Sequence, residues 1–216
     1  FGKLRWEIDW REKRGWAFGL DPSWKWDTYC GYLDTYYLPD DDGPDPRYTA
    51  ELLKVLRGRQ VKATFFMLGR RIEENPDLAK QVHAAGHELG NHSYSHPRMV
   101  FRTPAFVRDE IEKTDRLLEG IGARAARLFR APYGQQLLTV PYVLSRMGKA
   151  NIRWNVDPDD FAADDSGTIA SSVLSQVGPG SIILLHDNQP HTPAAVDRIV
   201  EELSARGFAF VTVGEL

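Results

Sequence analysis

Histidine pairs are the first residues in this chain whose type and spacing point to chemistry. His92 and His96 stand four residues apart, the spacing that puts two imidazoles on one face of a helical turn, ready to bind one metal ion. His83 and His87 have the same spacing, but Gly86 lies between them and follows a predicted helix. We therefore interpret His83 as a surface residue of that helix and His87 as a structural residue.

Charged residues directly follow several apolar segments of the chain. They are Asp40, Asp41 and Asp42 after residues 36–38, Arg130 at the end of 127–131, Asp157, Asp159 and Asp160 after 152–156, and His186 and Asp187 after 181–185. In a (β/α) barrel the carboxyl ends of the strands meet at one mouth, where catalytic groups sit. One aspartate and two histidines would leave a metal coordination position open for water, which is typical of a catalytic site.

Apolar segments alternate with amphipathic ones after residue 44, and this order predicts the elements that position these groups. We expect helices over 48–57, 77–85, 104–119, 137–147, 168–177 and 193–205, and strands over 61–68, 127–131, 152–156, 181–185 and 208–213. Thr103 and Ser166 are the expected caps of two of the helices. Strands alternating with helices indicate parallel βαβ units, here a distorted (β/α) barrel of about six or seven strands in a single domain.

The first part of the chain differs from the rest in composition. Five of the six tryptophans lie within the first 37 residues, where apolar periodicity is weak. We interpret residues 1–35 as an aromatic-rich lead-in packed on the barrel and 36–216 as the catalytic domain. A sugar-stacking surface is the alternative interpretation of these rings, but large aromatics more often serve core packing.

Composition excludes several other classes of protein. A net charge of -3 provides no broad basic field, which argues against nucleic acid as a partner. The single cysteine, Cys30, allows no internal disulfide, and no apolar run reaches the length of a membrane span. The chain begins at Phe1 rather than methionine, so we expect that a leader or other segment was removed, and we expect the protein to be secreted or associated with the cell envelope.

Five segments, in order, resemble the motifs of the polysaccharide deacetylases of the NodB-homology group, carbohydrate esterase family four. They are Asp41-Asp42-Gly43-Pro44, the His92 to His96 segment, Arg130-Ala131-Pro132-Tyr133-Gly134, Asp157-Pro158-Asp159-Asp160-Phe161 and Leu184-Leu185-His186-Asp187. Two departures stand out: Pro39 and Asp40 replace the Thr-Phe that precedes the first motif, and Phe161 replaces a tryptophan.

The resemblance implies a role for each residue of the site. Asp42, His92 and His96 resemble the metal ligands, Asp41 the general base, Arg130 its orienting partner, His186 the general acid and Asp160 the carboxylate that holds His186. It also implies that the backbone N–H of Tyr133 stabilises the oxyanion and that Phe161 and Leu184 line the pocket for the acetyl methyl group. The expected cofactor is one divalent ion, most simply zinc, although such a ligand set also accepts cobalt or nickel.

The resemblance further implies a hydrolase that removes N-acetyl groups from N-acetylglucosamine-type sugars of a chitin-like or peptidoglycan polysaccharide or oligosaccharide. We expect a monomer that binds this substrate. Two alternatives stay open: an acetyl ester hydrolase acting on xylan, and an inactive relative that only binds sugars. Three consecutive aspartates also leave a shifted register open, in which Asp40 and Asp41 serve in place of Asp41 and Asp42.

Overall fold

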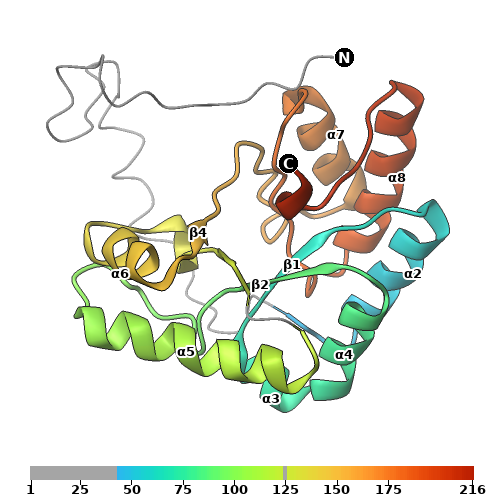
Figure 1. Cartoon of the computed structure of the whole chain (residues 1–216). Helices are drawn as coiled ribbons and strands as arrows, with labels where there is room; N and C mark the ends of the chain where they lie inside the picture. Colours follow the sequence, from blue (N-terminus) through green and yellow to red (C-terminus); the bar gives the residue numbers. More distant parts are fainter. Residues whose placement is uncertain (1–42, 124–125) are drawn as a thin grey trace, which may run out of the picture. The chain divides into compact units, whose positions relative to one another are not determined.

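The computed structural model of the chain describes residues 43–123 and 126–216 (Figure 1). These residues belong to a compact unit that spans Pro39–Leu216. The predicted lead-in and the three aspartates Asp40, Asp41 and Asp42 lie outside the described residues. The boundary between the lead-in and the catalytic domain therefore stays a prediction.

A parallel sheet forms the centre of the described residues, as the alternating pattern predicted. Its strands are β1 (Thr64–Met67), β2 (Glu88–Asn91), β3 (Leu128–Phe129) and β4 (Ala150–Asn151), hydrogen-bonded in that order. All neighbouring pairs are parallel, with Met67 opposite Asn91 and Asn91 opposite Phe129. Residues 43–123 and 126–216 thus contain a four-stranded sheet without closure, and the barrel of six or seven strands is not confirmed.

Three predicted strands differ in the structure, where backbone pairing is sparse and side chains accept some of the backbone hydrogen bonds. Residues 152–156 and 181–185 share only one parallel bridge, Val156 with Ile183, and the amide of Ile182 donates to Oδ1 of Asn155 at 2.7 Å. Residues 208–213 form no strand and lead into the 3₁₀ turn η3 (Val213–Glu215), where the amide of Val213 donates to Oγ1 of Thr64 at 2.8 Å.

Strand β2 was not predicted from the sequence, although it carries the segment before His92. It has only four residues and contains Gly90, so neither length nor β-branched content marks it. A Cβ at position 90 would lie 2.5 Å from the ring of Phe66. Glycine is required here because the aromatic ring of the neighbouring strand covers its backbone.

Helices lie where apolar periodicity and capping signals placed them. They are α2 (Thr49–Arg59), α4 (Pro76–Ala84), α5 (Pro104–Gly120), α6 (Thr139–Met147), α7 (Ser166–Gln176) and α8 (Thr192–Ala205), with a short unpredicted α3 (Gly69–Glu74). Thr103 caps α5 as predicted, because its Oγ1 accepts from the amide of Phe106 at 3.2 Å. Asp165, rather than Ser166, caps α7. Within the described part of the chain, every helix is too short or too polar to cross a bilayer.

The helices pack in pairs around buried apolar side chains. Helix α5 packs on β2 and on α6 (Figure 1). Phe129 is fully buried in the apolar cluster that these two helices share. Helices α7 and α8 pack on each other around Val156, Ile169 and Ile199. Helix α2 packs on α8, and this contact includes an ion pair of 2.6 Å between Arg59 and Asp197. This packing fixes the strand ends that carry the candidate site.

Candidate active site

The carboxyl ends of β2 and β3 bring His92 and Arg130 together. Asn91 and Phe129 are opposite each other in the sheet, so the residues that follow them emerge side by side. The amide of Arg130 donates to the carbonyl of Asn91 at 3.0 Å, and the amide of His92 donates to the carbonyl of Met67 at 3.0 Å. These bonds extend the parallel pairing to the point where the polar residues begin, as the barrel-mouth argument predicted.

Residues 92–96, the HSYSH loop, are not helical, and the expected helical turn is wrong. The amide of Ser93 donates to Oδ1 of Asn91 at 2.8 Å, and the amide of His96 donates to Oγ of Ser93 at 3.1 Å. Both Ser93 (φ 72°) and His96 (φ 55°) have left-handed backbone conformations. The imidazoles of His92 and His96 nevertheless converge, with ring centroids 5.0 Å apart. The predicted pair is therefore present, although side-chain hydrogen bonds build it.

The chemistry of His92 fits a metal ligand. Its Nδ1 lies 2.7 Å from the carbonyl oxygen of Arg130, and a carbonyl only accepts, so Nδ1 carries the hydrogen. The lone pair is then on Nε2, the arrangement that backbone carbonyls impose on metal-binding histidines. No three His, Cys, Asp or Glu side chains among the described residues form a metal-binding group, and the third predicted donor, Asp42, lies outside them. The described residues thus supply two of the three predicted ligands.

Arg130 is held between two aromatic rings at the end of β3. Its side chain is almost fully buried, and its guanidinium carbon lies 4.2 Å from the ring centroid of Phe66 and 5.4 Å from that of Trp154. Such contacts hold a cation in one orientation. Trp154 was missed as a site residue, although it is the one tryptophan outside the first 37 residues.

Asp157 and Asp159 form a turn around Pro158. Oδ1 of Asp157 accepts from the amide of Asp159 at 3.1 Å, and Oδ2 accepts from the indole N–H of Trp154 at 2.9 Å. Asp159 itself has a left-handed backbone, with φ 53°. Asp157 therefore shapes the turn that leads to Asp160.

Tyr133 lies against the second imidazole of the HSYSH loop. It belongs to the 3₁₀ turn η2 (Pro132–Gly134), and its ring centroid is 4.5 Å from that of His96. The guanidinium carbon of Arg98 lies 5.1 Å from the Tyr133 ring. Tyr133 has φ 58°, a conformation that costs energy for a non-glycine residue and clusters at functional sites. The turn thus places the ring of Tyr133, whose backbone N–H is the predicted oxyanion donor, beside a predicted metal ligand.

His186 forms a pair with the buried Asp160. Nδ1 of His186 lies 2.6 Å from Oδ1 of Asp160, whose residue is only 2% exposed. Oδ2 of the same carboxylate accepts from the amide of His186 at 2.8 Å and from the hydroxyl of Thr192 at 2.7 Å. The carboxylate therefore fixes both the backbone and the ring of His186. Thr192, at the start of α8, was not identified from the sequence.

The two residues predicted to line the acetyl pocket have different surroundings. The ring of Phe161 stands edge-on to that of His186, with centroids 6.0 Å apart, and is 52% exposed. Leu184 is half-buried, and its amide donates to the carbonyl of Val156 at 2.9 Å. The structure thus brings Phe161 to His186 and places Leu184 two residues before it.

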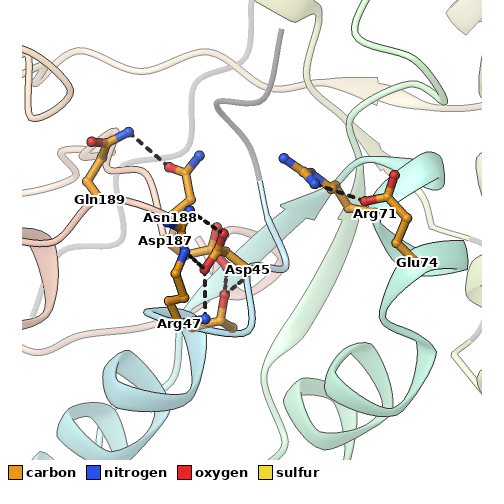
Figure 2. A network of polar contacts seen from close by, with 8 residues as sticks. Asp45, Arg47, Arg71, Glu74, Asp187, Asn188 and Gln189 are labelled. Atoms are coloured by element: carbon orange, nitrogen blue, oxygen red, sulfur yellow. Dashed lines mark hydrogen bonds and ion pairs between the residues drawn. The ribbon is translucent and has the colours of Figure 1, made fainter. Parts of the chain in front are cut away.

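Asp187 links the segment of His186 to the start of the described chain. Oδ2 of Asp187 accepts from Oγ1 of Thr49 at 2.7 Å, and a Cβ on Gly43 would lie 2.0 Å from Oδ1. Figure 2 shows Asp187 close to Asp45 and Arg47. Gly43 in turn accepts from the amide of Leu68, which follows β1. The backbone that follows Asp42 is therefore packed between the end of β1 and the residue after His186.

His87 has the structural environment that its sequence context predicted. Its Nδ1 accepts from the amide of Ala63 at 3.2 Å, and its ring packs 5.2 Å from that of Phe65. Burial of the side chain lowers the pKa of His87 to about 4, and nearby Lys62 adds to this effect. Because Nδ1 already accepts a backbone hydrogen, the ring is neutral.

Comparisons with known proteins agree on one family. A family model described as polysaccharide deacetylase matches residues 34–152. A chitooligosaccharide deacetylase of Azorhizobium caulinodans is 36% identical over 188 residues, which cover 80% of this chain and 90% of that protein. The solved structure of the Bc1960 peptidoglycan N-acetylglucosamine deacetylase is similar with a TM-score of 0.77 and 33% identity, covering 81% of this chain and 84% of that one.

A solved CE4 family pseudoenzyme from Bacillus anthracis is also similar, with a TM-score of 0.75 and 32% identity. The similarity covers 78% of this chain and 60% of that one. Similarity of fold in this group therefore extends to a protein described as a pseudoenzyme, so activity has to be argued from individual residues.

Proposed function

Because the chain belongs to the polysaccharide deacetylase family, in which its curated relatives are named as deacetylases, hydrolases that act on C–N bonds, we propose that it removes N-acetyl groups from N-acetylglucosamine-type sugars with the help of a divalent metal ion. The observation that carries the proposal is the pairing of two converging imidazoles with a separate, carboxylate-held histidine. The imidazoles of His92 and His96 suit a metal ion, and His186, held by Asp160, suits proton transfer.

The proposed metal ligands are His92, His96 and Asp42, with zinc as the preferred ion. Such an ion supplies a Lewis acid that polarises the acetamide carbonyl and makes water more nucleophilic. His92 is oriented for this role by the carbonyl of Arg130. Asp41 is the proposed base that takes the proton of the attacking water, and Arg130 is its proposed orienting cation.

The other proton transfer is assigned to His186. An amine leaves poorly unless it is protonated, so an amide substrate needs a general acid on its leaving nitrogen. Asp160 holds Nδ1 of His186, so we assign proton delivery to Nε2, the other ring nitrogen. The backbone N–H of Tyr133 is the proposed donor to the oxyanion, and Phe161 and Leu184 are the proposed walls of the acetyl pocket.

The proposed substrate is an oligosaccharide or polysaccharide of the chitin or peptidoglycan type. The support is the similarity to proteins described as chitooligosaccharide and peptidoglycan N-acetylglucosamine deacetylases. We also propose that the full catalytic domain is a distorted (β/α) barrel, that the protein acts as a monomer, and that it works outside the cell or at the cell envelope, where such polymers occur.

Acetate release tests the proposal directly. The full chain, incubated with zinc, should release acetate from chitooligosaccharides or peptidoglycan, and a chelator should abolish this activity until zinc or cobalt is added back. Activity on acetylated xylan alone would favour an ester hydrolase. Metal binding and chitooligosaccharide binding without acetate release would favour an inactive sugar-binding relative.

A further inference from the structure

Glu110 is a buried carboxylate whose hydrogen bonds all point to the HSYSH loop. It lies on α5 and is 5% exposed. Its Oε2 accepts from the amide of Tyr94 at 3.1 Å and from the amide of Ser95 at 2.8 Å, and its Oε1 accepts from Oγ of Ser95 at 2.9 Å. One side chain thus binds two of the three peptide N–H groups between His92 and His96, and the third, that of Ser93, donates to Asn91.

The carbonyl side of the same loop is held by another helix. The amide of Gly69 donates to the carbonyl of Ser93 at 3.0 Å, and the amide of Arg70 donates to the carbonyl of Tyr94 at 3.0 Å. Both donors lie in the first turn of α3, where amides have no partner inside the helix. The loop is therefore bound through its carbonyls by α3 and through its amides by α5.

The loop needs such support because its backbone is strained. Ser93 and His96 both have left-handed conformations, which non-glycine residues keep only where the surroundings fix them. Glu110 is placed where it stabilises the peptide groups between the two strained residues.

We propose that Glu110 is a positioning residue for the metal site. By fixing the amides of Tyr94 and Ser95, it holds the two imidazoles at the separation that lets them bind one ion. The inference rests on the proposed metal dependence, because it concerns the affinity of His92 and His96 for that ion. Glu110 is not one of the proposed ligands, and a hydrogen-bonding role requires acceptor atoms at the right distance rather than negative charge.

Metal affinity of Glu110 variants tests this role without measuring turnover. Zinc dissociation constants are measured on the full chain by competition with a chromophoric chelator, and cobalt absorption spectra report the coordination geometry. Loss of partners that orient metal ligands weakens metal binding by about 10- to 100-fold, and we expect Glu110→Ala to fall in this range. Glu112→Ala is the matched control, because this carboxylate is on the same helix and is more exposed.

Two conservative variants separate positioning from charge and do not depend on the alanine variant folding. Glu110→Gln keeps the length of the side chain, and its amide can still accept from the loop amides and donate to Oγ of Ser95. It should bind zinc within about threefold of wild type, whereas Glu110→Asp, which keeps the charge but is shorter, should bind about tenfold more weakly.

The opposite order, with Glu110→Asp unchanged and Glu110→Gln weak, would overturn the positioning role in favour of a charge effect. Unchanged affinity in all three variants would overturn it as well. In both cases zinc binding by the wild type would leave the proposed function standing. A wild type that binds no zinc would overturn the metal-dependent function together with this inference.

Discussion

Replacement of Asp160 by asparagine is the most specific test of the proton-transfer half of the site. The Asp160 carboxylate accepts three hydrogen bonds, two at Oδ2 and one at Oδ1 from Nδ1 of His186. Asparagine has one acceptor oxygen. That oxygen is best placed where Oδ2 receives two donors, and the amide NH₂ then faces Nδ1 of His186 and cannot accept its hydrogen.

The expected loss follows from this exchange. A protonated imidazole then lacks the charged partner on its Nδ1 side, and a hydrogen bond to a charged group is worth about 1.5–3 kcal/mol. Because about 1.4 kcal/mol corresponds to a factor of ten in rate, Asp160→Asn should lower amide hydrolysis by roughly ten- to 150-fold. The loss should be milder than that of His186→Ala, which removes the acid altogether and should cost about a hundred- to ten-thousand-fold.

The assay compares two leaving groups on the same protein. Acetate release from an N-acetylated chitooligosaccharide requires protonation of the leaving nitrogen, whereas an activated acetyl ester releases an alcohol that needs little acid help. Asp160→Asn should therefore reduce amide hydrolysis clearly more than ester hydrolysis, with the metal content unchanged. Asp157→Asn is the control, because Asp157 lies in the same segment and contacts Trp154 and Asp159 instead of His186.

Equal losses on the two substrates would refute the reasoning, because His186 would then do something other than protonate a leaving group. Loss of metal from the Asp160→Asn protein would also refute it, since that result would connect Asp160 to the ligands. A loss in Asp157→Asn as large as that in Asp160→Asn would mean that the fold of the segment, and not the Asp160 carboxylate, is responsible.

Two further predictions concern the register of the aspartates and the pH dependence of stability. Asp42→Asn should lose both metal and turnover, Asp41→Asn should keep metal and lose turnover, and Asp40→Asn should change little; an inactive Asp40→Asn protein with bound metal would shift the assignment by one residue. The pKa of His87 is lowered from 6.5 to about 4, so the folded state binds fewer protons than the unfolded state below pH 6.5. Above pH 6.5 His87 is neutral in both states and does not reduce the free energy of unfolding. As the pH drops from 6.5 to 4, the free energy of unfolding should fall by up to about 3 kcal/mol. Urea unfolding at several pH values should show this loss in the wild type and a smaller one in His87→Gln, and the same loss in both would contradict the prediction.

The helices and the family motifs could be read from the sequence because their signals are local. The period of apolar residues and the Thr103-Pro104 start placed α5 within one residue of its observed end. The strands 152–156 and 181–185 were harder to predict. The side chain of Asn155 accepts the hydrogen of the Ile182 amide, which a regular strand pair would give to a backbone carbonyl. That hydrogen bond depends on residues more than twenty positions apart.

The geometry of the site was predictable only in part. The spacing of His92 and His96 predicted the pair, but the same spacing suggested a helix, while a loop held by Asn91 and Ser93 forms it. Glu110 and Thr192 gave no local signal, since each acts through a tertiary contact on a segment at least fifteen residues away. The roles of Asp41 and Asp42 rest on the motif alone.

The support of the HSYSH loop from two helices has a consequence for the thermodynamics of ion binding. A free loop would lose roughly 1–2 kcal/mol of backbone conformational entropy for each residue that an arriving ion orders. Here hydrogen bonds from α3 and to Glu110 already restrict the peptides between the two imidazoles. The loop is therefore already ordered when the protein folds, so ion binding loses less conformational entropy and the affinity for the ion is higher. Chelation should accordingly be reversible, with the loop keeping its shape for the next ion.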